Sequence, residues 1–229
     1  MMKTKWLRCS IDASLADISE VLIKAHYYQG RDKGFEIAET LKNCLRGRFV
    51  EEFIENEIIF DPFGERIENN IRRYTIFNFV ILPLAKQRYL IRIDAPPRSL
   101  KGLVSAFSEI FGFGFSITVC EIDIFSLVSE LKSCPLVTSC AFKKMKVSGV
   151  PLTETSIAKV EVYSSADAYV DLRKTVSLKG VSFEKATVDI NKKTENRLEI
   201  SSSGMICGEM IWIENLMPTL KIFFQKTDK

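Results

Sequence analysis

The sequence has 229 residues, of which 46% are hydrophobic and 27% charged, so it can bury a substantial core and is not a disordered chain. Its net charge of +3 is too small to indicate a nucleic-acid-binding protein by itself. No apolar stretch reaches the roughly 18–20 residues of a membrane span, and residues 1–12 lack the apolar region of a secretory signal. We therefore expect a cytoplasmic protein with no membrane partner.

The cysteines indicate neither a metal site nor a cofactor. They contain no Cys-x-x-Cys pair, and the chain has one histidine, His26, so a zinc site would need an almost all-cysteine ligand set that the spacing does not provide. An even number of cysteines permits disulfides, which the absence of a secretory signal disfavours. We expect reduced, mostly buried thiols at Cys9, Cys44, Cys120, Cys134, Cys140 and Cys207.

Two helices are predicted near the start of the chain, after a strand over residues 5–11. Ser14 and Asp17 have the spacing of a capping box, with Asp where Glu is usual. Apolar residues then recur at helical intervals at Leu15, Ile18, Leu22 and Ala25. The same spacing predicts a second helix over residues 35–45, at Ile37, Ala38, Leu41 and Leu45. Arg46 and Arg48 would follow that helix, where cations complement its dipole or bind phosphate.

The next segment predicts a turn and a hairpin. Residues 49–60 fit a helix in their first half and an extended chain in their second. Asp-Pro-Phe-Gly at residues 61–64 is typical of a turn. Residues 74–82 are rich in aromatic and β-branched side chains and predict a buried strand. Residues 83–87 could close a hairpin onto the strand that follows.

Residues 88–124 give the clearest pattern, which is strand, helix, strand. Tyr89, Ile91 and Ile93 share one face of a strand over residues 88–94. Ser99 predicts the N-cap of a helix, and Gly112 its C-terminal end. The apolar face of this helix comprises Leu100, Leu103, Val104, Phe107 and Phe111. A second strand is expected over residues 113–124.

This unit permits two arrangements, one of which suggests a metal site. The helix could join parallel neighbours through a right-handed crossover, or a further strand could lie between the two in a ferredoxin-like antiparallel sheet. In the parallel case Asp94 and Asp123 would lie near one edge of the sheet, where carboxylates can hold Mg²⁺. Aspartates at strand ends also form turns and caps, which is the alternative.

The remaining elements predict an α+β protein with mixed or antiparallel sheets and helices packed on one face. We expect helices over residues 125–132 and 169–176, and strands over residues 139–147, 157–163, 181–190, 197–201, 205–213 and 219–224. Residues 148–156 are rich in Gly, Pro, Ser and Thr. They suggest an N-terminal α+β domain, residues 1–148, and a β-rich domain or a continuation of the same domain, residues 149–229. A weak similarity of the segments that follow Asp123 and Asp171 suggests two similar halves.

Three functions are compatible with these patterns. The first is a non-enzymatic binding or assembly subunit of a multi-protein complex, with Trp212, Met210 and Met217 as the partner-binding surface; the alternative is that these residues complete the core. The second is sequence-tolerant binding of DNA or RNA by clustered cations, at Arg46, Arg48, Arg72, Arg73, Lys143, Lys144 and Lys146. Acidic residues near the arginines weaken the case for nucleic-acid binding.

The third function is a metal-dependent nuclease or hydrolase that uses Asp94, Glu121 and Asp123. No nucleophile, general base or complete ligand set accompanies these carboxylates. We therefore predict a binding protein with one or more protein partners, with nucleic acid as the second possible partner.

Overall fold

The computed structural model describes residues 1–60, 62–178, 180–191 and 193–227. Contacts within the chain group it into two compact units. The ribbon unit comprises Cys9–Ile117, and the terminal unit comprises Met1–Arg8 together with Thr118–Lys229. A division between residues 148 and 149, as the sequence suggests, stays a prediction.

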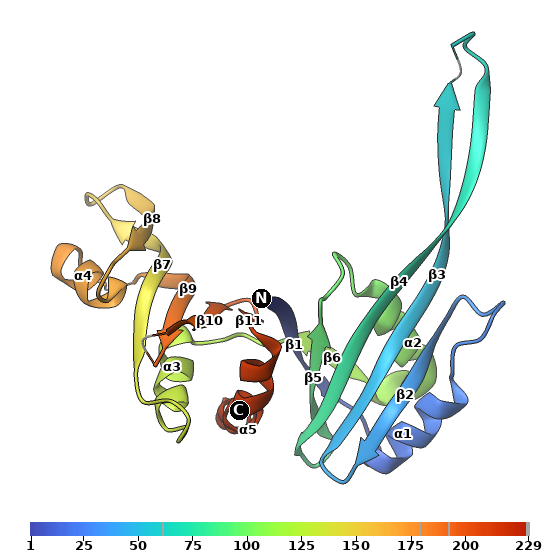
Figure 1. Ribbon diagram of the computed structural model, residues 1–229, viewed down its shortest axis with the longest axis horizontal. Helices are drawn as coiled ribbons and strands as arrows, with labels where there is room; N and C mark the ends of the chain where they lie inside the picture. Colours follow the sequence, from blue (N-terminus) through green and yellow to red (C-terminus); the bar gives the residue numbers. More distant parts are fainter. Residues whose placement is uncertain (61, 179, 192, 228–229) are drawn as a thin grey trace. The chain divides into compact units, whose positions relative to one another are not determined.

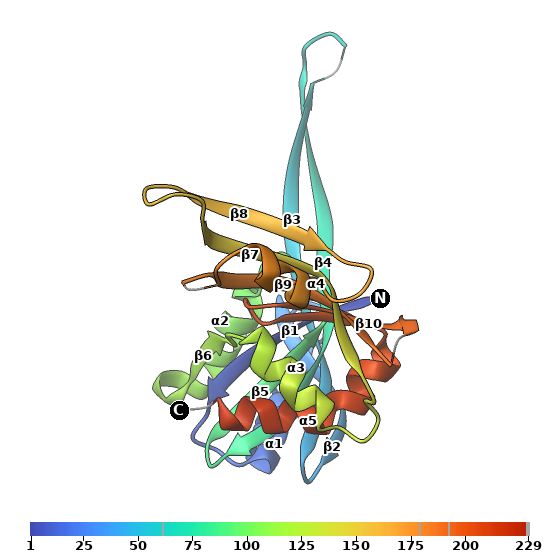
Figure 2. The ribbon, with the colours of Figure 1, turned by 90° about the vertical axis from the view of Figure 1, so that its left-hand side faces the viewer.

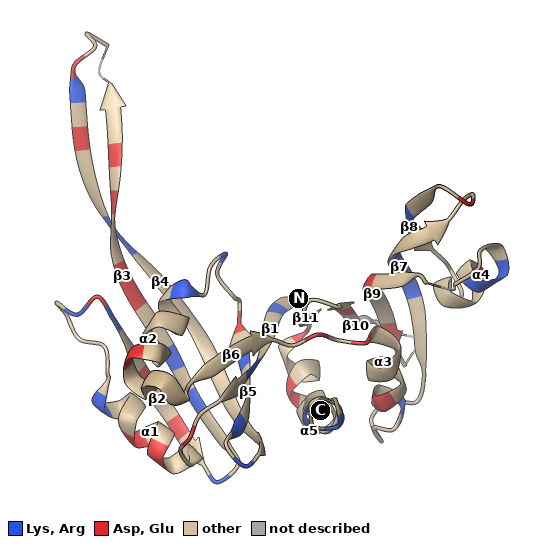
Figure 3. Cartoon of the chain, turned by 180° about the vertical axis from the view of Figure 1, so that it is seen from behind, with Lys and Arg blue, Asp and Glu red and all other residues tan. Residues whose placement is uncertain are grey.

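The ribbon unit is built on an antiparallel meander of four strands in the order β2-β3-β4-β5 (Figure 1). The strands are β2 (Lys33–Leu41), β3 (Cys44–Phe60), β4 (Arg66–Ala85) and β5 (Arg88–Asp94). Helices α1 (Leu15–Lys24) and α2 (Lys101–Phe111) lie on the same face of this sheet (Figure 3). Strand β1 (Met2–Ser10) is a neighbour of β5 in the strand order and crosses the division between the units.

Aromatic packing between the sheet and α2 forms the core of the ribbon unit. Phe35 of β2 is buried, and its ring lies 5.3 Å from both Phe49 and Phe107. Phe79 of β4 meets Phe35 edge-on at 6.0 Å. Such offset and tilted pairs add to the stabilisation that burial of the rings provides.

Several sequence predictions in the ribbon unit are confirmed. Ser14 and Asp17 form the capping box of α1, and residues 88–94 form β5. The hairpin between β4 and β5 is present, with Gln87 at a positive φ of 62°. Helix α2 ends at Gly112, whose φ of 63° suits a residue without a Cβ. The N-cap predicted at Ser99 is wrong by one residue: the N-cap of α2 is Leu100, and the hydroxyl of Ser99 accepts a hydrogen bond from the Lys101 amide.

The helix predicted over residues 35–45 is wrong. This segment is β2, a turn and the start of β3, which pair from Lys33↔Glu51 to Leu41↔Cys44. A register shift between Ile37 and Glu39 interrupts the alternation of side chains along β2. Because the bulge shifts the apolar residues from a period of two, their spacing imitates that of a helix.

Strand β6 (Ser116–Val119) is shorter than the strand predicted over residues 113–124. It pairs with β1, which is also next to β5 in the strand order, so one strand lies between β5 and β6. The parallel-neighbour arrangement is therefore wrong.

The terminal unit contains the antiparallel series β11-β10-β9-β7-β8 (Figure 2). Its strands are β7 (Cys140–Pro151), β8 (Ile157–Tyr163), β9 (Ser182–Ile190), β10 (Lys193–Ser201) and β11 (Met205–Gly208). Its helices are α3 (Ile124–Lys132), α4 (Ala168–Thr175) and α5 (Met210–Lys226). The first residues of β1 pair with β11, and Trp6 stacks on Phe224 of α5 at 5.4 Å.

The strands predicted over residues 205–213 and 219–224 are wrong beyond Gly208, because most of this region is the helix α5. The residues that α5 buries are spaced by three and four, which is the pattern of one helix face. They are Ile213, Leu216, Leu220, Phe223 and Phe224. Pro218 lies inside this helix.

The described residues thus form an α+β fold with antiparallel strand ladders, as predicted. Two similar halves are not confirmed: Asp123 is the N-cap of α3, whereas Asp171 lies within α4, whose N-cap is Asp167. Among the described residues, no helix is both long enough and apolar enough to cross a membrane.

Candidate interaction surface

Strands β3 and β4 extend far beyond their neighbours in the ribbon unit (Figure 1). The last β2–β3 pair is Lys33↔Glu51, and β4 pairs with β5 only from Phe79 onward. Residues 53–60 of β3 and 66–73 of β4 continue to pair with each other, from Phe53↔Arg73 to Phe60↔Arg66. We call these two segments the β3–β4 ribbon. At about 3.4 Å per residue it is roughly 27 Å long.

A polar network fixes the base of the β3–β4 ribbon. Glu52, in the position before the ribbon, accepts a hydrogen bond from the Tyr27 hydroxyl at 3.0 Å and pairs with the Arg72 guanidinium at 3.1 Å. Its amide donates to the Asp32 carbonyl at 2.6 Å. Loss of hydration and the neighbouring Glu52 carboxylate raise the pKa of Tyr27. These contacts join the base of the ribbon to the segment between α1 and β2.

The β3–β4 ribbon exposes large apolar side chains on both of its faces. Because alternate residues of a strand face opposite sides, Ile54 and Ile58 share one face and Phe53 and Ile59 the other. Ile54 is 64% exposed and Phe60 67% exposed. The exposed apolar residues of the ribbon are Phe53, Ile54, Ile58, Ile59, Phe60 and Ile67, and Phe63 in the connecting turn is 91% exposed.

The two strands of the ribbon carry different charges (Figure 3). The β3 segment contains Glu55 and Glu57 and no cation, and Glu51 and Glu52 precede it. The β4 segment contains three arginines, at positions 66, 72 and 73, and the single acid Glu68. One strand of the ribbon is therefore acidic and the other predominantly basic.

The structure pairs the predicted nucleic-acid-binding arginines with carboxylates. Arg46 and Arg48 on β3 face Glu39 and Glu36 of β2, at 3.6 and 2.5 Å. On the ribbon, Arg72 pairs with Glu52 at 3.1 Å and Arg73 with Glu55 at 3.0 Å. These four arginines therefore lie on two neighbouring strands of one unit, each beside an acid that offsets its charge.

The predicted lysine cluster lies on β7 of the terminal unit. Lys143 donates to the carbonyls of Ser165 and Ala166 at 2.6 and 2.9 Å. Lys144 pairs with Glu161 of β8 at 2.8 Å and lies over the Tyr163 ring. Hydrogen bonds that the Lys144 ammonium donates to Glu161 and Tyr163 raise the pKa of Lys144, so its ammonium form is stabilised locally. Lys146 lies two residues further along the same strand.

The predicted partner-binding residues Met210, Trp212 and Met217 all lie on α5 and are half-buried. The indole N–H of Trp212 donates to the Asn196 side chain at 2.5 Å, which ties the helix to β10. Ile211 is the exposed apolar residue of this part of α5. A partner on this surface stays a prediction.

The two weak catalytic candidates lie in different units and each has a structural partner. Asp94 is buried on β5 and pairs with Arg92, which is also buried, with contacts of 2.7 and 3.0 Å. Asp123 caps α3, where its carboxylate accepts from the Ser126 amide at 2.7 Å. Across the residues that the structure describes, no group of three or more His, Cys, Asp or Glu side chains has the proximity needed to hold a metal ion.

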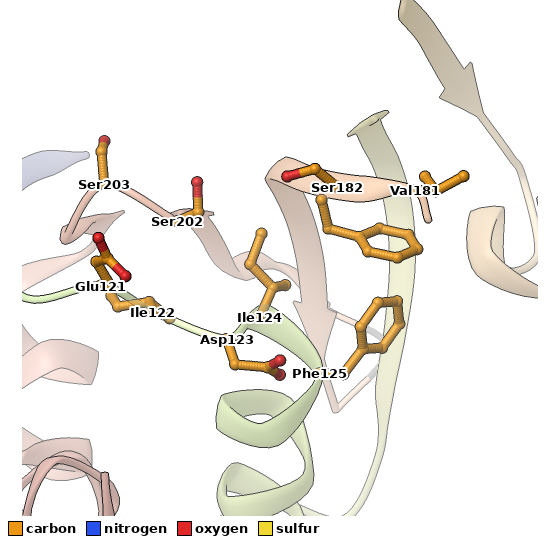
Figure 4. A pocket seen from close by; sticks show the side chains of 10 residues that line it. Glu121, Ile122, Asp123, Ile124, Phe125, Val181, Ser182, Ser202 and Ser203 are labelled. Carbon is orange, nitrogen blue, oxygen red and sulfur yellow. The ribbon is translucent and has the colours of Figure 1, made fainter. Parts of the chain in front are cut away.

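A shallow depression of about 630 Å³ lies in the terminal unit at the start of α3 (Figure 4). Glu121, Ser202 and Ser203 lie on one side of it, and Val181 and Ser182 on another. Phe125 meets Phe183 edge-on at 4.5 Å. The depression combines serine hydroxyls with apolar walls. The carboxylate of Asp123 already accepts a hydrogen bond as the N-cap of α3.

Comparison with known proteins assigns no family to the chain. No protein-family model matches the sequence, and no curated protein matches it significantly.

The β3–β4 ribbon is the feature that the sequence analysis missed. Residues 53–60 read Phe-Ile-Glu-Asn-Glu-Ile-Ile-Phe, a composition that suits a strand. The polar residues that follow the turn, among them Asn69 and Asn70, obscured the matching strand on the other side. A symmetrical run of extended residues around the Pro-Phe-Gly turn was the signal that could have indicated it.

Proposed function

We propose that this protein is a non-enzymatic binding or assembly subunit of a multi-protein complex, and that the β3–β4 ribbon is its docking element. The proposal depends on one observation, which is that the ribbon exposes aromatic and branched apolar side chains on a two-stranded arm. A two-stranded arm contributes little to the stability of a domain, because it lacks a further strand or a helix to pack against.

Binding of a partner gives a physical reason for these exposed residues. Burial of exposed apolar surface is favourable by about 25 cal/mol per Å², so a partner that covers the ribbon gains from each covered side chain. Apolar patches rimmed by charge are typical of protein-binding surfaces. The open backbone edges of the ribbon also offer hydrogen bonds for the addition of a strand.

The alternative function, sequence-tolerant nucleic-acid binding, receives less support from the geometry. A phosphate-tracking surface needs cations without neighbouring carboxylates, because carboxylates repel the phosphates. Five of the seven predicted cations lie beside a carboxylate, from Arg46–Glu39 to Lys144–Glu161. A metal-dependent hydrolase is supported still less, because Asp94 is paired with Arg92. A cytoplasmic location stays a prediction.

The test is a quantitative affinity isolation from extracts of the source cells with three tagged baits and one tagged control. The first is the full chain. In the second, Asn-Gly replaces residues 54–72, so that the Phe53↔Arg73 pair flanks a two-residue turn suited to a tight hairpin. The third is the point variant Ile58→Lys. A matched control, Ile157→Lys, changes a residue that is 74% exposed on β8.

We expect specific partners to be enriched at least tenfold with the full chain and with the Ile157→Lys control. The shortened chain and the Ile58→Lys variant should lose those partners. Purified partner should then bind the full chain directly and bind the shortened chain at least tenfold more weakly. Equal enrichment by all baits would contradict a role for the ribbon in docking.

A further inference from the structure

We propose that the β3–β4 ribbon binds a second copy of this chain, with β3 of one copy lying against β4 of the other. This inference deepens the proposed docking function and depends on it. The charges and open backbone edges of the ribbon indicate that a second copy of this chain is the molecule that binds it.

The backbone of the ribbon is open on both sides. Among the described residues of the ribbon unit, β3 has no β2 partner beyond Glu51 except the Glu52 amide contact, and β4 has no β5 partner before Phe79. Residues 53–60 and 66–73 therefore each present one row of backbone N–H and C=O groups that the described ladders do not use. Such an edge is a template for another strand.

The side chains of the ribbon provide the charge complementarity that selects the pairing. The acidic strand offers Glu55 and Glu57, and the basic strand offers Arg66, Arg72 and Arg73. Contact of β3 with β3 would oppose carboxylates, and contact of β4 with β4 would oppose arginines, both of which are destabilising. Contact of β3 with β4 places opposite charges together and covers apolar residues from both copies.

This pairing is heterologous, because two different surfaces meet. Each ribbon therefore offers one acidic side and one basic side to other copies. Most of the charges already have a partner within their own ribbon, Arg66 with Glu68 at 2.7 Å and Arg73 with Glu55 at 3.0 Å, and Arg72 pairs with Glu52 just before the ribbon. Exposed pairs of this kind contribute little, so exchange of their partners on assembly costs little. The apolar contacts then provide the affinity and the charges provide the choice of partner.

The test is sedimentation velocity of the purified full chain from micromolar to high micromolar concentrations, together with two charge-reversed variants. The first variant, Glu55→Lys with Glu57→Lys, makes the acidic strand basic. The second, Arg66→Glu with Arg73→Glu, makes the basic strand acidic. Each variant alone opposes like charges across the proposed contact, whereas a mixture of the two opposes unlike charges at every contact.

We expect the full chain to self-associate with rising concentration, each variant alone to sediment as a monomer, and the mixture to regain species larger than a monomer. Charge reversal also places like charges across each ribbon, and mixing does not relieve that repulsion within the chain. Recovery in the mixture therefore reports the contact between copies. Circular dichroism and thermal unfolding of each variant establish that both are folded.

A full chain that stays monomeric over the whole range would overturn the inference, as would variants that associate as well as the full chain or a folded mixture that stays monomeric. These results leave the docking proposal intact if the ribbon still captures another protein in the affinity isolation. If the shortened chain also retains every partner, the docking proposal fails as well.

Discussion

The ion pair of Arg92 and Asp94 offers the sharpest test of the structure. Arg92 is 1% exposed and Asp94 7% exposed, and two contacts, of 2.7 and 3.0 Å, join them two residues apart on β5. Removal of one partner leaves the other charge buried, which typically costs about 3–5 kcal/mol. For a chain of this size a loss of 1 kcal/mol lowers Tm by roughly 2–4 °C, so Arg92→Met should lower it by about 6–20 °C.

Replacement of both charges should cost much less than replacement of one. An apolar pair of similar volume avoids the desolvation penalty, so the double variant Arg92→Met with Asp94→Leu should unfold within a few degrees of the wild type. The assay is thermal unfolding of the two single variants and the double variant, which forms a double-mutant cycle. If the double variant instead loses as much stability as the two single variants combined, the two side chains do not act as a pair, and the reasoning that makes Asp94 structural is refuted.

Three further predictions concern other parts of the fold. Phe35→Ala should lower the free energy of unfolding by about 3–5 kcal/mol because Phe35 is buried among three rings, whereas exposed Phe53→Ala should change it by less than about 1 kcal/mol in the same denaturant titration; similar losses would contradict the packing. Ser14→Ala should cost about 1 kcal/mol by the same measurement, since it removes the cap of α1, and no loss would count against the capping box. Burial raises the pKa of the Cys140 thiol, so its alkylation should be slower in the folded than in the unfolded chain at mildly alkaline pH and should accelerate as the pH rises further; equal rates in the folded and unfolded chain would contradict a buried thiol.

The elements that could be predicted from the sequence are those whose local signals agree with their packing. Helix α1 has a capping box and an apolar face that the core uses, and β5 alternates as a strand that ends at two prolines. The sequence patterns predicted the wrong element for β2 and α5, where the apolar residues suit both a strand and a helix. In β2 a bulge after Ile37 gave a strand the apolar intervals of a helix. In α5, a run of branched residues and Pro218 hid a helical face whose members are three and four apart.

The candidate surface was less predictable than the fold, because exposure depends on where neighbouring strands end. The composition of residues 53–60 predicts a strand but cannot reveal that β2 stops opposite Glu51. The cation clusters were visible in the sequence, as were nearby acidic residues such as Glu52 and Glu55. Their pairing with Arg72 and Arg73 depends on the register of β3 against β4, which no local pattern specifies.

The central claim is that the β3–β4 ribbon is the binding element, and amide hydrogen exchange tests it most directly. Exchange would be compared between the isolated chain and the same chain in its purified complex, whether the partner is a second copy or another protein. An open two-stranded arm should exchange rapidly when free. The account predicts that binding slows exchange over residues 53–60 and 66–73 at least tenfold. Protection elsewhere, with exchange in the ribbon unchanged, would contradict it.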